Sequence, residues 1–87
     1  MATLSPDVLQ DDLAVSLARV LAAANKRARE LGLDVPQSLI TITQHAEDGL
    51  RWRINYGPRN YLGRRGGDLV VEVDAKDASI KQVLRGQ

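Results

Sequence analysis

The N-terminal part of the chain repeats apolar residues at steps of three and four, the spacing that lines one face of an α-helix. Ser5-Pro6-Asp7 is a typical helix start, because serine can cap free amides and Pro6 lacks an N–H where the first turn cannot use one. Gly32 followed by Leu33 is typical of a helix end. We therefore predict one long helix from Pro6 to the residue before Gly32. Its apolar positions include Ala14, Leu17, Leu21, Ala24, Ala28 and Leu31.

After Pro36 the apolar period changes to two, the period of a β-strand. Residues 38–44 read SLITITQ, and residues 45–49, HAEDG, supply turn residues. This pattern predicts a β-hairpin, and the rings and arginines of its second strand should lie on opposite faces. In that strand Leu50, Trp52, Ile54 and Tyr56 alternate with Arg51, Arg53 and Asn55.

Two further segments complete the predicted sheet. Residues 68–74, DLVVEVD, form a third strand with Leu69, Val71 and Val73 on one face. The tail is ambiguous, because Ile80, Val83 and Leu84 fit a helical turn while Ile80, Gln82 and Leu84 fit a short strand. The sequence thus predicts one α+β domain over residues 1–87. A long N-terminal helix should pack on one face of an antiparallel sheet of three or four strands.

Composition excludes several classes of protein. Cysteine is absent, so no disulfide, thiolate metal site or cysteine nucleophile is available. The formal net charge is +1, without the strongly basic character of most dedicated nucleic-acid binders. No segment approaches the roughly 18 apolar residues that span a bilayer, and the first residues do not resemble an export signal. We expect a cytoplasmic protein that contacts no membrane.

Positive charge is concentrated between Arg51 and Arg65, which contains five arginines and no acid. The segment could be a nucleic-acid surface, an anion-binding loop or a polar hairpin beside the core. Because the rings of its strand should face the core, they are not expected to stack on bases. Tyr61 is freer, since it lies in a predicted loop between Arg59 and Arg64. There a ring and two or three guanidiniums could bind phosphate, carboxylate or an acidic partner.

Patterns that would indicate catalysis are weak. The glycines of this segment lack the spacing of a phosphate-binding loop. His45 could form a metal or acid–base cluster with Glu47 and Asp48, but their spacing favours a solvent-exposed histidine at a strand end. The serines have no evident base. The acids of the third strand, Asp68, Glu72 and Asp74, are expected to pair with Arg51 and Arg53 across the strands. We expect no enzyme activity, no cofactor and no metal.

Self-association is an open alternative for this chain. The helix is rich in alanine, which permits close approach of a sheet or of a second helix, and a strip at Val8, Val15 and Ala22 could contact a partner. A small open sheet also has unprotected edges. A homodimer through the helix or an edge strand is therefore possible, as is internal packing alone.

The order of these elements resembles the PepSY family of small α+β modules. The resemblance is carried by an alanine-rich helix followed by LITITQ, LRWRINY and GGDLVVEVDA, and most specifically by residues 71–75 and Ile80. Asp77 and Ala78 stand where that family has a Thr-Gly turn. The resemblance implies that the tail is a fourth strand. It also implies a non-catalytic module that binds or restrains another protein, suggested in that family to be a peptidase.

Taken together, these patterns indicate a small protein-interaction module without catalysis. It should contact an unknown protein partner through an arginine-rich loop and an exposed sheet edge or helix strip. The predicted contact residues are Arg59, Tyr61, Arg64 and Arg65, flanked by Arg51 and Arg53. The alternative hypothesis is binding of single-stranded nucleic acid or RNA through the same residues.

Overall fold

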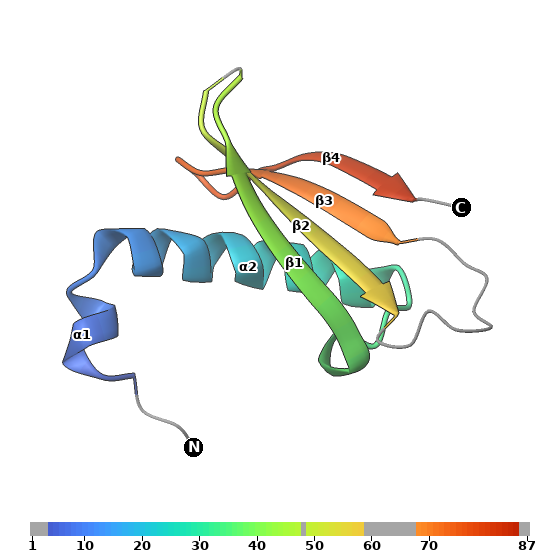
Figure 1. Cartoon of the computed structure of the whole chain (residues 1–87), viewed down its shortest axis with the longest axis horizontal. Coiled ribbons are helices and arrows are strands. Elements are labelled where there is room, and N and C mark those ends of the chain that lie inside the picture. The colour runs from blue at the N-terminus through green and yellow to red at the C-terminus, as the bar shows by residue number, and fades with distance from the viewer. Residues whose placement is uncertain (1–3, 48, 59–67, 86–87) are drawn as a thin grey trace.

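The computed structural model describes residues 4–47, 49–58 and 68–85, and it has the predicted α+β architecture (Figure 1). A long helix, α2 (Asp12–Glu30), lies across one face of a four-stranded antiparallel sheet. The shorter helix α1 (Pro6–Leu9) precedes it, and a single 3₁₀ turn, η1 (Val35–Gln37), leads into the sheet. Within the described ranges no helix is long and apolar enough to cross a membrane.

The prediction of one unbroken helix from Pro6 is wrong, because the helix is interrupted between Leu9, where α1 ends, and Asp12, where α2 begins. Asp11 has an extended backbone, with φ −101° and ψ 104°, and its carboxylate accepts a hydrogen bond from the Ala14 N–H at 3.0 Å. Aspartate competes with the helical backbone for hydrogen bonds in this way, so it ends α1 and caps α2. Ser5, the predicted cap, makes no side-chain capping bond.

The predicted end of the long helix is confirmed in its hydrogen bonds. Gly32 takes a left-handed conformation with φ +90°. Its N–H donates to the Arg29 carbonyl, and the Leu33 N–H donates to the Ala28 carbonyl, both at 3.0 Å. This pair of bonds is the Schellman closure, which satisfies two carbonyls that the helix end leaves free.

The sheet is a simple meander in which each strand pairs with the next along the chain. The strands are β1 (Ser38–His45), β2 (Arg51–Pro58), β3 (Leu69–Asp74) and β4 (Ile80–Arg85). The ambiguous tail is therefore a strand. Strands β1 and β4 form the two edges (Figure 1).

The turn between β3 and β4 contains a backbone conformation that alanine rarely adopts. Ala78 has φ +59°, in the left-handed region. Its N–H donates to the Asp74 carbonyl at 3.0 Å, while the Asp74 carboxylate accepts the Lys76 N–H at 2.7 Å. These bonds hold the turn closed and keep Ala78 in its left-handed conformation. Glycine would adopt this conformation without strain.

The core lies between α2 and the inner face of the sheet. Three fully buried small or β-branched residues of the helix, Val20, Ala24 and Ala28, allow the backbones to approach closely. The central strands supply the opposite wall with Trp52, Ile54, Tyr56, Leu69, Val71 and Val73, as the alternation predicts. Leu50 differs from the prediction, because it precedes β2 and remains 47% exposed.

One polar bond crosses this core. The Tyr56 hydroxyl donates to Asn25 Oδ1 at 2.6 Å, which joins α2 to β2. Burial raises the pKa of Tyr56 to about 12, against a smaller lowering by Arg29. The phenol therefore stays neutral throughout the physiological range and remains a donor.

Replacing Ala78 by glycine is expected to raise the free energy of unfolding by about 0.5–1 kcal/mol, because glycine adopts a positive φ without strain. Chemical denaturation monitored by circular dichroism measures the change. The control is Ala75→Gly in the same turn, which lacks the positive φ and should lower stability. Equal effects of the two substitutions would contradict the assignment of strain to Ala78.

Replacing Tyr56 by phenylalanine should cost about 1 kcal/mol of stability at neutral pH, because Asn25 loses a buried donor. In the wild type, the raised pKa favours the folded state fully below pH 10.0, and this contribution is lost as the pH rises toward about 12. The free energy of unfolding, measured by denaturation at several pH values across this range, should fall less steeply with pH in Tyr56→Phe than in the wild type. Identical slopes for the two proteins would contradict the role of this phenol.

Candidate functional site

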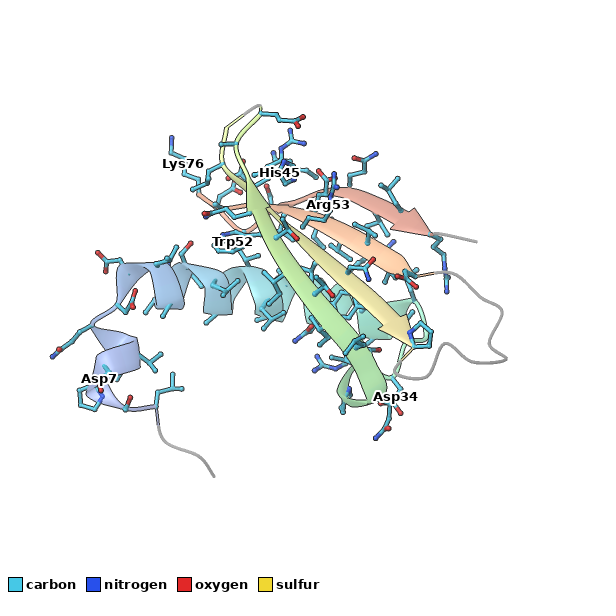
Figure 2. The ribbon with its side chains drawn as sticks, in the orientation of Figure 1. Asp7, Asp34, His45, Trp52, Arg53 and Lys76 are labelled. Atoms are coloured by element: carbon cyan, nitrogen blue, oxygen red, sulfur yellow. The ribbon has the colours of Figure 1, made fainter. Side chains whose placement is uncertain are left out.

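The face of the sheet opposite α2 changes in character along the strands. Residues paired directly across antiparallel strands share a face, so the register fixes which side chains meet there. One end is charged and holds His45 and Arg53 (Figure 2), whereas exposed leucines lie toward the other end. We call this surface the open face; its members are Leu39, Thr41, Thr43 and His45 on β1, Arg51, Arg53 and Asn55 on β2, Val70, Glu72 and Asp74 on β3, and Gln82 and Leu84 on β4.

Glu72 is the centre of the charged end. It is buried, with 4% of its surface exposed, although it lies on a face that no helix covers. Arg53, its partner in the β2–β3 register, donates to Oε2 from Nη2 at 2.8 Å and from Nε at 3.2 Å. The Arg53 side chain itself is half exposed. The arginine thus covers the carboxylate and also presents part of its guanidinium to solvent.

The second oxygen of Glu72 faces two weaker partners. Arg51 Nη1 lies 3.7 Å from Oε1, and His45 Nε2 lies 3.9 Å from it, both beyond hydrogen-bond range. His45 Nε2 and Arg51 Nε are buried and have no hydrogen-bond partner in the described part of the chain. Two guanidiniums therefore surround one carboxylate, and Asp74, the register partner of Arg51, adds a second acid at this end of the open face.

His45 differs in part from its prediction. It is the last residue of β1, as a strand-end histidine should be, but its side chain is only 25% exposed and lies beside Glu72. Pairing of His45 with Arg51 across β1 and β2 brings it there. Within the described ranges, no three histidine, aspartate or glutamate side chains converge as metal ligands would.

The acids of β3 and its border have three different roles. Glu72 pairs with the arginines, as predicted. Asp68 accepts a hydrogen bond from Asn55 Nδ2 at 2.9 Å, and Asp74 binds the backbone of the following turn. Cross-strand pairing of acid and arginine is thus confirmed for Glu72, whereas Asp68 and Asp74 bind other groups.

The other end of the open face is apolar. Leu39 on β1 is 48% exposed and Leu84 on β4 is 44% exposed, with the half-buried Val70 opposite Leu84. Sequence alternation alone did not single out these residues. Their position depends on the register of the edge strands.

The predicted contact residues fall into two groups. Arg59, Tyr61, Arg64 and Arg65 lie outside the described residues. Arg51 and Arg53 lie together on the open face at the Glu72 carboxylate. The two rings of β2, Trp52 and Tyr56, point into the core as predicted and offer no stacking surface on the open face.

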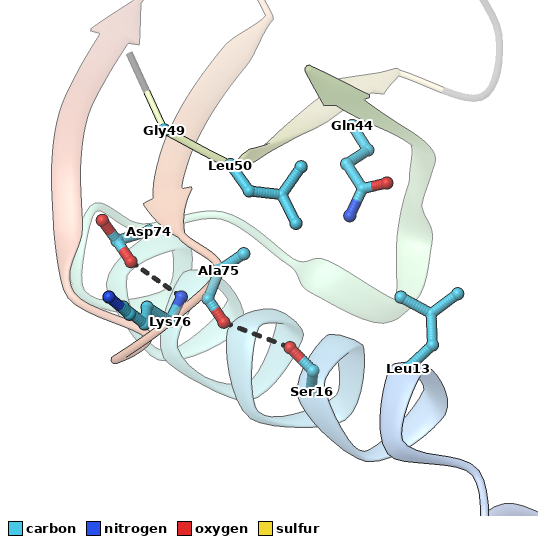
Figure 3. Close-up of a pocket in the computed structure, with 8 residues that line it drawn as sticks. All are labelled: Leu13, Ser16, Gln44, Gly49, Leu50, Asp74, Ala75 and Lys76. Carbon is cyan, nitrogen blue, oxygen red and sulfur yellow. Dashed lines mark hydrogen bonds between the residues drawn. The ribbon is translucent and has the colours of Figure 1, made fainter. Parts of the chain in front are cut away.

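A hollow of about 480 Å³ lies at the end of the sheet beside β1 (Figure 3). The Ser16 hydroxyl donates to the Ala75 carbonyl at 3.2 Å and closes one side. Leu13 and Leu50 give the hollow an apolar wall and are themselves exposed. Its described lining residues are Leu13, Ser16, Gln44, Gly49, Leu50, Asp74, Ala75 and Lys76.

The helices expose apolar residues in addition to part of the predicted strip. Of that strip, Ala22 is exposed and Val8 and Val15 are half-buried, whereas Leu4, Leu9 and Leu13 are 58–59% exposed. These leucines belong to α1, to the residue pair before it and to the first turn of α2.

Comparison with family models, curated proteins and solved structures finds no match for this chain.

Removing the Arg53 side chain should test the Glu72 pairing. We expect Arg53→Ala to lower the free energy of unfolding by about 1–2 kcal/mol, because the buried carboxylate loses both hydrogen bonds. Arg27→Ala is the matched control: it removes an exposed Arg–Glu pair on α2 and should cost less than about 0.5 kcal/mol. Urea denaturation measures both, and equal costs would contradict a special role for the buried pair.

Proposed function

We propose that the protein is a small, cytoplasmic, non-catalytic protein-interaction module that binds a partner protein through its open face. Arg51 and Arg53 would supply the charged contacts of this face. Arg59, Tyr61, Arg64 and Arg65, which the sequence predicts as further contacts, lie outside the described residues. The resemblance to PepSY modules implies the same class of role.

The observation that supports this proposal is the combination of partly exposed arginines and exposed leucines on the face of the sheet opposite α2. Arg51 and Arg53 occupy one end of the face, and Leu39 and Leu84 occupy the other. Protein interfaces combine an apolar centre with polar groups at the rim, and arginine is enriched in them. A surface of phosphate contacts alone would not need the leucines.

The charged end suits a carboxylate on the partner. Glu72 and Asp74 lie opposite the two arginines, so a partner's carboxylate would bind the guanidinium donors that remain exposed rather than an unpaired charge. The exposed half of Arg53 can donate to it, since a guanidinium has donors beyond those that Glu72 uses. We therefore expect an acidic residue of the partner beside Arg53 and apolar residues against Leu39 and Leu84.

A random peptide library displayed on phage provides a partner-independent test. Selected peptides should combine acidic and apolar residues and bind the wild-type protein. Arg51→Gln and Leu84→Lys should each weaken binding about tenfold, because they remove one charged contact and one apolar contact. Lys76→Ala, in the exposed turn between β3 and β4, is the control and should leave binding unchanged.

A salt series separates this function from nucleic-acid binding. Affinity for selected peptides should fall only modestly with salt, whereas phosphate contacts make affinity fall steeply. An NMR titration with a mixed single-stranded oligonucleotide at low salt should leave the β2 amides unshifted. Oligonucleotide shifts on β2 that vanish with salt, together with no selected peptide, would overturn the proposal.

A further inference from the structure

The two edges of the sheet are built differently. Edge strand β1 has the sequence SLITITQH, with no lysine, arginine, aspartate, glutamate or proline. Its register with β2 runs without a break from Ser38 opposite Pro58 to His45 opposite Arg51. Among the described strands, none pairs with its outer side. An edge of this kind leaves alternate N–H and C=O groups free to bind another strand.

Edge strand β4 has features that hinder such pairing. It carries Lys81 and Arg85, and it is shorter than β1, with six residues against eight. Its register with β3 is interrupted between Glu72 and Val73. Charge, short length and irregular pairing are the devices that protect edges from adding strands. Extension of the sheet is therefore favoured at β1.

Exposed apolar side chains lie on β1 and on the helix segments that extend past it in Figure 1. Helix α1 and the start of α2 extend past β1 in Figure 1, so the sheet does not cover them. Leu9 and Leu13 on these segments are 59% and 58% exposed. Ile42 on β1 itself is 37% exposed, on the face toward the helix. A sheet continued beyond β1 would cover this apolar surface.

We propose that β1 pairs antiparallel with β1 of a second copy of this chain, across a two-fold axis. In such a dimer each strand meets its own sequence, and β1 brings no like charges together, whereas β4 against β4 would oppose lysine and arginine. The joined sheet has only the two protected β4 strands as edges. The assembly is therefore closed and does not grow into fibres.

The second copy also accounts for the uncovered helix surface. Two-fold symmetry places the sheet of each copy beyond the β1 edge of the other, where Leu9 and Leu13 are exposed. Backbone pairing and burial of these leucines would stabilise the same dimer. The open faces of the two copies would lie on the same side and form one larger surface, which extends the proposed function without depending on it.

Sedimentation velocity at high micromolar concentration should show that the wild-type protein has twice the mass of one chain. Thr41→Lys places a charge on the exposed middle of β1 and should raise the dissociation constant about tenfold or more. Gln82→Lys is the matched control, since it adds the same charge on the open face of β4. It should leave the dimer intact.

Leu13→Lys provides a second variant, at an exposed position in the first turn of α2, outside β1. It should also weaken the dimer, and circular dichroism checks that each variant is folded. A monomeric wild type, a dimer unaffected by Thr41→Lys or Leu13→Lys, or equal dissociation by Gln82→Lys would each overturn the proposal. Leu84→Lys distinguishes the two proposals, because it should weaken peptide binding about tenfold and leave the dimer intact.

Discussion

Close packing of one helix against two strands is the constraint on which the rest of this structure depends. Val20, Ala24 and Ala28 are fully buried against the inner side of β2 and β3, where Ile54, Val71 and Val73 are also fully buried. Alanine lets the helix approach the sheet closely enough to exclude water. Within residues 4–47, 49–58 and 68–85, one long helix covers one face of the sheet, so the opposite face must be stabilised by other means. The Glu72 cluster provides them: it ties β2 to β3 through a carboxylate that is buried by the arginine stems beside it rather than by a helix.

The two surfaces considered for binding follow from the same shortage of covering elements. The open face is uncovered because the helix lies on the other side, and the β1 edge is uncovered because the meander ends there. The open face carries arginines and leucines, which suit a partner of mixed character. The edge carries no charge and offers mainly backbone groups, which suit a strand. The chemistry of each surface is therefore distinct, although both result from the size of the chain.

Apolar residues occupy every second position in β2 and β3, so the inner face of these strands was predictable from the sequence. The same alternation predicted that Arg51 and Arg53 lie on the face opposite Trp52 and Tyr56. The break at Asp11 was not predictable, since the apolar stripe continues through it and only the competing carboxylate bond ends the first helix. His45 joins Glu72 through the register of β1 with β2, which alternation within one strand does not determine. Exposure of Leu13 and Leu50 depends on where the helix crosses the sheet, a tertiary property. The β4 strand was ambiguous because six residues with three apolar positions satisfy both periods.

The meander order has a consequence for how the chain reaches this structure. Each strand pairs only with its neighbour in sequence, so the whole sheet can form by successive closure of short segments. Among the described residues, the contacts most distant in the chain join α2 to β2, to β3 and to the turn after β3, as in the Tyr56–Asn25 and Ser16–Ala75 bonds. Low average sequence separation of contacts is associated with fast folding, because little loop entropy is lost before contacts form. The slow step expected for this topology is therefore the packing of α2 on a preformed β2–β3 hairpin. Substitutions on the buried face of α2 should change the folding rate more than substitutions in the sheet.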